Sequence, residues 1–147
     1  MLDDDALGAA LALLAAEYRE LIRIRDQHSP GTAIFVNCYD FPKVTGKGVC
    51  FHGPWLKPSL DYAYQQSGVA NALADDEYLV VCEMLQRFRS MLVSIANEKD
   101  VSGFYVIETQ GSLIPSDLDW ANELHPTQAG FQKIATKFQS ALQVIFP

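Results

Sequence analysis

Two stretches of sequence decide the fold of this chain: AIFVNCYD at residues 33–40 and GFYVIET at residues 103–109. Each is a short run of β-branched and aromatic residues whose start does not alternate with polar positions. Strands that are buried on both faces of a parallel sheet have this pattern. Helical patterns precede, separate and follow the two runs, so the order of elements predicts an α/β layer with parallel strands and right-handed crossovers.

The helices are predicted from apolar residues that repeat at intervals of three and four. The first helix has aspartates at its amino-terminal end, where the helix dipole favours negative charge. Asp75 or Asp76 is expected to cap the third helix, which places Leu79 on its apolar side. Thr127 is expected to cap the last helix, whose packing stripe includes Phe131. The first three helices are predicted at residues 2–27, 57–67 and 75–100.

Composition limits the kinds of protein that this chain can be. Its 147 residues are 49% hydrophobic, which suits one domain with a real core, and its formal charge of −7 argues against a nucleic-acid partner. The apolar run at residues 6–16 follows three aspartates and is too short to span a membrane, so we expect no membrane span and a cytoplasmic location. The three cysteines and three histidines lack metal-ligand spacing, so we expect no metal and no cofactor.

Two long loops follow the predicted strands, at residues 40–60 and 110–126. Both belong at the carboxyl edge of the sheet, where open α/β sheets gather their reactive groups. His125 lies in the second loop, just before a helix, and an imidazole suits proton transfer near neutral pH. The alternative is that His125 is only a capping or surface residue.

Three residues of the first loop region are candidates for binding a substrate. Tyr39, Asp40 and Trp55 would line an acyl or sugar pocket, because aromatic rings supply apolar area beside a few placed polar groups. The alternative is that Trp55 packs with Phe51 in a small satellite core that orders the loop. Asp40, at the end of a strand, also suits a role in ordering the loop.

The segment NELHPTQAGFQKIA, residues 122–135, resembles the final sequence block of the SGNH (GDSL-like) hydrolases. AIFVNCYDFP at residues 33–42 and GPWLKPSLD at residues 53–61 are similar to a strand end and a loop of one bacterial branch of that family. The resemblance implies a flavodoxin-like three-layer α/β fold that hydrolyses small-molecule esters with a serine nucleophile. Residues 1–147 would be a single partial domain of this fold, with about two parallel strands and four helices.

His125 occupies the position of the family's catalytic base. The family has an aspartate three residues earlier, and this chain has Asn122 there. An amide accepts a hydrogen bond from the imidazole but supplies no charge to stabilise its protonated form. Asp119 or Glu123 would substitute for the missing aspartate, and Asp119 is favoured if the loop folds back on itself. The alternative is that both are solvated charges of the loop.

The nucleophile has no counterpart in this chain. None of its nine serines lies in a Gly-Asp-Ser block, and a Gly-x-Asn-Asp block is also absent. Ser112 and Cys50 are weak candidates, and Cys38 belongs to a buried strand. The chain therefore matches only the carboxyl-terminal part of the family domain. It is either part of an ester hydrolase that is inactive alone, or a half-domain that acts in binding or assembly without catalysis.

An incomplete sheet has a consequence for association. If the preceding strands are absent, the strand at residues 33–39 loses its neighbour on one side. An apolar edge of this kind is a template for pairing with another chain. We therefore expect a homo-oligomer, or a complex with the missing half, formed through the edge at residues 33–39.

Overall fold

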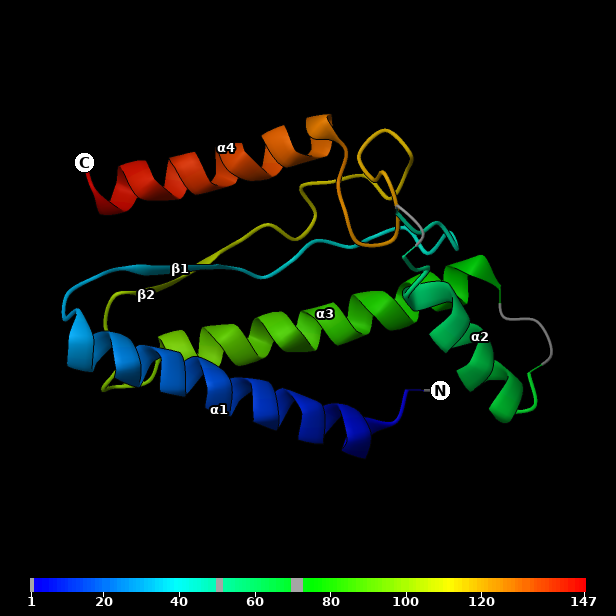
Figure 1. Ribbon diagram of the computed structural model, residues 1–147, viewed down its shortest axis with the longest axis horizontal. Helices are drawn as coiled ribbons and strands as arrows, with labels where there is room; N and C mark the ends of the chain where they lie inside the picture. Colours follow the sequence, from blue (N-terminus) through cyan, green and yellow to red (C-terminus); the bar gives the residue numbers. More distant parts are fainter. Residues whose placement is uncertain (1, 50–51, 70–72) are drawn as a thin grey trace.

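The computed structural model describes residues 2–49, 52–69 and 73–147. In these residues the chain is a mixed α/β structure of four helices and a two-stranded parallel sheet, as the sequence predicts. Figure 1 shows α4 along one face of the sheet, and α1 and α3 along the other. The elements are α1 (Asp4–His28), β1 (Ile34–Asn37), α2 (Leu56–Gln66), α3 (Ala74–Ala96), β2 (Phe104–Ile107) and α4 (Gln128–Ile145).

The two strands pair in parallel, with Ile34 opposite Phe104 and Asn37 opposite Ile107. β1 is shorter than the predicted strand because the chain turns sharply at Tyr39, whose φ angle is 59°. The expectation that β1 is buried on both faces is wrong, since its side chains are half-buried or exposed. The physical reason is that, in the described residues, β1 has a strand neighbour on one side only.

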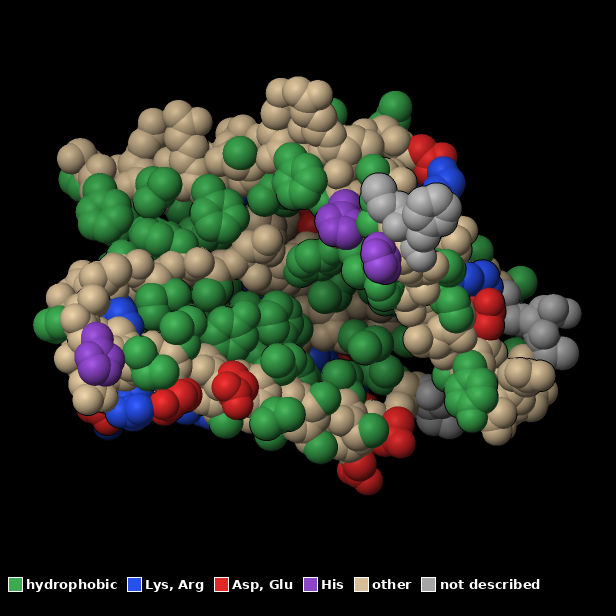
Figure 2. All heavy atoms as spheres, viewed as in Figure 1, with side chains coloured by type: hydrophobic (Ala, Val, Ile, Leu, Met, Phe, Trp, Pro, Cys, Tyr) green, Lys and Arg blue, Asp and Glu red, His purple; other side chains and the backbone are tan. Residues whose placement is uncertain are grey.

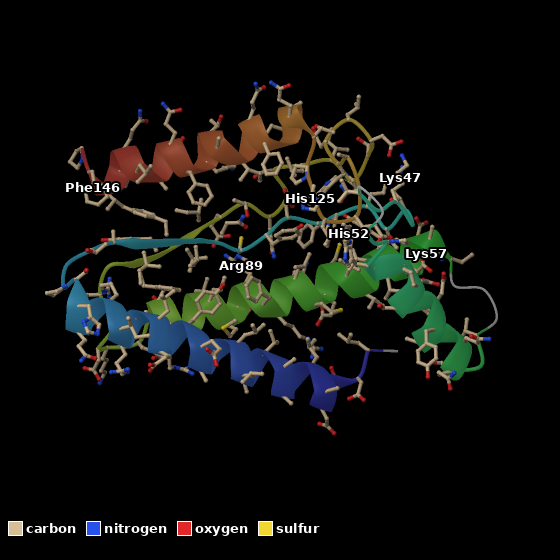
Figure 3. All side chains as sticks on the ribbon, viewed as in Figure 1. Lys47, His52, Lys57, Arg89, His125 and Phe146 are labelled. Atoms are coloured by element: carbon tan, nitrogen blue, oxygen red, sulfur yellow. The ribbon has the colours of Figure 1, made fainter. Side chains whose placement is uncertain are left out.

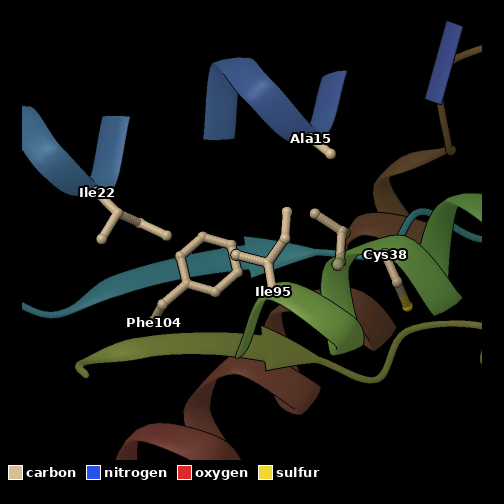
Figure 4. Close-up of a cluster of buried hydrophobic side chains, with 6 residues drawn as sticks. Ala15, Ile22, Cys38, Ile95 and Phe104 are labelled. Atoms are coloured by element: carbon tan, nitrogen blue, oxygen red, sulfur yellow. The ribbon is translucent and has the colours of Figure 1, made fainter. Parts of the chain in front are cut away.

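The hydrophobic core lies between the sheet and the α1–α3 pair (Figure 4). Leu92 and Ile95 of α3 are completely buried there, against Phe104 of β2. α1 contributes Ala15 and Ile22, which lie on one side of the helix. On the opposite face, the rings of Phe35 and Tyr105 stack with their centroids 5.2 Å apart. Alternate residues of each strand therefore pack against different helical layers.

Arg25 joins the end of α1 to the start of the sheet. Its side chain is buried, and its guanidinium donates hydrogen bonds to the carbonyl oxygens of Thr32 at 2.5 Å and Ser102 at 2.6 Å. These two residues precede β1 and β2 respectively. Arg25 therefore lies on the packed side of α1, where it binds backbone carbonyls.

The packed side of α3 differs from the prediction. The helix begins at Ala74 after Leu73, so Asp75 and Asp76 lie in the first turn and do not cap it. Leu79 is 61% exposed, whereas Glu77 is buried and forms an ion pair with Lys57 of α2 at 2.7 Å. The contact with α2 turns Glu77 inward and leaves Leu79 outside. No helix in the described ranges is long and apolar enough to cross a membrane.

Candidate functional site

The loops that follow β1 and β2 meet the segment before α4 and enclose a cavity of about 470 Å³. The segment is a tight turn in which Trp120 and Pro126 form an antiparallel bridge and the His125 carbonyl accepts from the Ala121 N–H at 2.9 Å. The polar lining of the cavity includes His125 and Asn37. Its apolar lining includes Leu113, Trp120, Phe131 and Ile134. His125 lies close to the amino-terminal end of α4 (Figure 3).

Asn122 holds the imidazole of His125. The Oδ1 atom of Asn122 lies 3.0 Å from His125 Nδ1, and it also accepts the backbone N–H groups of Leu124 at 2.9 Å and His125 at 3.0 Å. An amide oxygen can only accept, so His125 Nδ1 must carry the proton. Nε2 is then the unprotonated nitrogen of the neutral ring, which is the form a general base needs.

Two aromatic side chains fix the surroundings of His125. The ring of Trp55 meets the imidazole edge to face, with centroids 6.1 Å apart. The hydroxyl of Tyr39 donates to the Leu124 carbonyl, and burial raises the pKa of Tyr39 to about 12. The Tyr39 hydroxyl therefore stays protonated and remains a donor at neutral pH. Tyr39 lines the cavity of His125, whereas Trp55 lines an adjacent cavity of about 420 Å³ between α2 and α3.

The Asp119 side chain forms no hydrogen bond with His125 in the described structure. Its buried carboxylate accepts the Ile114 N–H at 2.8 Å and pairs with Lys133 Nζ of α4 at 2.6 Å. The hydrogen bond from the Ile114 N–H, followed by that from Lys133, lowers the pKa of Asp119. Asp119 therefore anchors α4 to its preceding loop, and Asn122 is the group that orients the imidazole.

Asp40 lines the cavity, but its carboxylate is already occupied. Its side chain is 3% exposed, and it accepts three backbone N–H groups, from Phe41 at 2.8 Å, Gly111 at 2.7 Å and Leu113 at 2.7 Å. These bonds join the loop after β1 to the loop after β2. Asp40 shapes the wall of the cavity, and both of its oxygens are engaged by backbone donors.

No candidate nucleophile is hydrogen-bonded to the His125 ring in the part of the chain that the structure describes. The buried Oγ of Ser112 has no hydrogen-bond partner there, and Ser112 does not line the cavity. Cys38 is fully buried, and its Sγ donates to the Ile107 carbonyl at 3.3 Å. Cys50 lies outside the described residues, as does Phe51, the expected neighbour of Trp55.

Sequence reasoning missed most of the apolar wall of the cavity. Trp120 is 3% exposed and its ring lies 6.1 Å from that of Tyr39, although its place in a polar loop suggested no such role. Phe131 was expected in the packing stripe of the last helix, but it is 53% exposed and lines the cavity. The sequence did carry one signal that Trp120 lies at the site, which is the presence of a large aromatic residue five positions before a histidine.

Among the described residues, no cluster of three or more histidine, cysteine or acidic side chains has the geometry to hold a metal ion. Comparison with protein-family models, curated proteins and solved structures finds no match for the chain. Any functional assignment therefore depends on the chemistry of the residues around His125.

Proposed function

We propose that this chain supplies the general base and part of the substrate pocket of an SGNH-type serine ester hydrolase with a flavodoxin-like three-layer fold. The observation that carries the proposal is the 3.0 Å contact between His125 Nδ1 and Asn122 Oδ1 beside the cavity. It leaves Nε2 free to accept a proton. The Gly-Asp-Ser nucleophile of the family is not in this sequence, so we expect the chain to be inactive alone.

The proposed chemistry assigns one proton to His125. Nε2 removes the proton of a serine hydroxyl as the serine oxygen attacks the ester carbonyl, and it then returns the proton to the departing alcohol. Asn122 fixes the tautomer and the direction of the ring. It has no negative charge, so the protonated imidazole is stabilised less than it would be beside an aspartate.

The walls of the cavity favour a particular kind of ester. Leu113, Trp120 and Ile134 supply an apolar surface, and the carboxylate of Asp40 is engaged by backbone N–H donors. A charged or highly hydroxylated group would find few free polar partners there. We therefore assign the pocket to an apolar acyl group.

The tautomer of His125 tests its role as a base. In nitrogen-15 NMR spectra at a pH where the ring is neutral, we expect the proton on Nδ1 and the lone pair on Nε2. The Asn122→Ala variant should revert to the Nε2–H form, because the acceptor for Nδ1 is gone. A parent ring with its proton on Nε2 would remove the basis of the proposal.

Hydrolysis of short p-nitrophenyl esters provides the second measurement. The parent chain and its His125→Ala variant should both show negligible turnover, because the base has no nucleophile to serve. Robust turnover by the parent that is lost in the variant would contradict the claim that the nucleophile is missing. Ser112 and Cys50 would then be the residues to test.

A second function is favoured by the outer edge of β1. Ile34 and Cys38 direct their N–H groups to β2, at 2.7 Å and 3.4 Å, so Phe35 and Asn37 direct theirs to the other side. Figure 2 shows hydrophobic side chains gathered near α4 on one side of the strands, and near α1 and α3 on the other side. Leu21 of α1 is 46% exposed and Phe146 is 60% exposed. Such an edge suits an assembly module that pairs with a second copy or with a complementary half-domain.

Proline at position 37 tests pairing through this edge. Asn37→Pro removes one outward N–H, and Asn37→Ala keeps that N–H while it removes the same side-chain contacts. If the chain self-associates through β1, the proline variant should bind itself roughly tenfold more weakly than the alanine variant. The measurement is light scattering over a range of concentrations. A folded parent that stays monomeric at high concentration would argue against self-association.

A further inference from the structure

Glu123 lies two residues before His125, in a loop where a glutamate would ordinarily face solvent. Its side chain is instead completely buried, with an exposed fraction of 0%. A buried carboxylate is costly unless several donors satisfy it. The contacts of Glu123 therefore show which parts of the surrounding structure its carboxylate holds together.

Four backbone N–H groups satisfy this carboxylate. Oε1 accepts from Gly46 at 2.8 Å and Lys57 at 3.0 Å. Oε2 accepts from Trp55 at 2.7 Å and Leu56 at 2.8 Å. Three of these donors belong to the start of α2, whose N-cap residue Trp55 supplies no capping side chain of its own. Glu123 thus caps α2 from a distant loop, with its charge at the positive end of the helix dipole.

The same contacts bring the start of α2 against His125. The backbone N–H of Trp55 is bound to Glu123, and its ring lies edge to face with the imidazole at 6.1 Å. A second link joins the same two loops, because the Glu123 N–H donates to the Lys47 carbonyl at 3.4 Å.

We propose that Glu123 is a positioning residue for His125. By binding the start of α2 it holds the Trp55 ring against the imidazole, and so limits the directions in which Nε2 can face the cavity. The inference rests on the proposed function, in which His125 is the base. It deepens that function because two residues would then hold the imidazole. Asn122 binds its Nδ1 atom, and the Trp55 ring packs against the ring itself.

Glu123 acts through geometry and not as the partner of a charged imidazole. All four of its hydrogen bonds go to backbone donors outside the His125 ring. The Nδ1 atom of the ring is taken by Asn122. Removing the charge of Glu123 should therefore change where Trp55 lies before it changes the tautomer of His125.

The test compares Glu123→Gln with Glu83→Gln, each made in the 147-residue chain. Glutamine keeps the size of Glu123 but turns an amide NH₂ toward backbone donors, which removes half of the cap. Glu83 is an exposed residue of α3 with a side chain 47% exposed, so its variant makes the same change of charge elsewhere. Both variants are first compared with the parent for cooperative unfolding.

The readout is the contact between Trp55 and His125 in NMR spectra. The parent and Glu83→Gln should show cross-relaxation between the two rings and a step in the Trp55 indole N–H shift when the imidazole is protonated. Both signals should be lost in Glu123→Gln, while the fold is retained. Their persistence in a folded Glu123→Gln chain would overturn the inference.

A second variant keeps the test decisive if Glu123→Gln does not fold. Trp55 is only partly buried, so Trp55→Ala should leave the core intact while it removes the ring that packs against the imidazole. The expected result is increased motion of the His125 ring with the Nδ1–H tautomer unchanged. An unchanged ring would overturn the inference, whereas an Nε2–H tautomer in the parent would overturn the base role and leave the Trp55 contact standing.

Discussion

Replacing Gly130 with alanine is expected to destabilise the chain by about 1–3 kcal/mol, the usual cost of inserting a methyl group into a filled space. Gly130 lies in the first turn of α4, where its N–H donates to the capping hydroxyl of Thr127 at 3.1 Å. An added Cβ would stand 2.4 Å from the Asp119 carbonyl oxygen and 2.9 Å from Pro126 Cβ. Neither atom belongs to the far end of a flexible side chain, which could move aside.

The matched control is Gly8→Ala in the second turn of α1. Gly8 is exposed, and nothing lies within 4 Å of a Cβ added there. Alanine at this position should stabilise the helix by roughly 0.5–1 kcal/mol, because it restricts the unfolded chain and favours helix. Urea unfolding, monitored by circular dichroism, measures both free energies. Equal stability of the two variants would show that α4 does not sit as close to the Asp119 carbonyl as described.

The Gly130 substitution also reports on the site. The Thr127 N–H donates to the Asp119 carbonyl at 2.8 Å, so the first turn of α4 and the loop before it form one unit around His125. If α4 shifts to accommodate the methyl group, the turn that carries Asn122 and His125 shifts with it. The Nδ1–H signal of His125 should therefore broaden in Gly130→Ala and remain sharp in Gly8→Ala.

The parts of the fold that sequence predicts well depend on local patterns. The runs at 33–40 and 103–109 contain β1 and β2, which pair in parallel because their composition and the helices between them leave few other arrangements. Thr127 caps α4 because a threonine before an apolar repeat satisfies its N–H groups locally. Periodicity also located α2 and α3 to within about one residue at their starts.

The parts that sequence could not predict depend on contacts between distant segments. Glu123 binds N–H groups that are between 66 and 77 residues away in the sequence. No local pattern distinguishes it from a solvated loop glutamate. The same is true of Glu77, which is buried because Lys57 reaches it from another helix. The predicted burial of β1 failed because periodicity describes a strand's own residues and not the number of its neighbours.

The candidate site shows the same division. His125 and its place before a helix were evident from sequence, and Tyr39 does line the cavity beside it. The choice between Asn122, Asp119 and Glu123 as its support was open, because all three lie within the six residues before the histidine. Geometry decides it in favour of Asn122, since Asp119 binds Lys133 and Glu123 caps α2.

Replacing Asp40 with alanine is expected to have the largest effect on stability, about 3–5 kcal/mol. The substitution leaves the N–H groups of Phe41, Gly111 and Leu113 without their acceptor, and each buried donor left unsatisfied costs about 1–3 kcal/mol. These costs are not additive, because the loop can partly relax toward water. The total is still a large share of the stability of a small domain.

Two further variants separate the hydrogen bonds of Asp40 from its charge. Asp40→Asn keeps one acceptor oxygen and should lose about half as much stability as Asp40→Ala. Asp61→Ala removes an exposed carboxylate, 55% exposed and paired with Lys57, and should cost about 0–1 kcal/mol. Urea unfolding of the four chains gives the comparison. If Asp40→Ala unfolds no more easily than Asp61→Ala, the Asp40 carboxylate does not join the loops after β1 and β2, and the cavity beside His125 must be held open by other contacts.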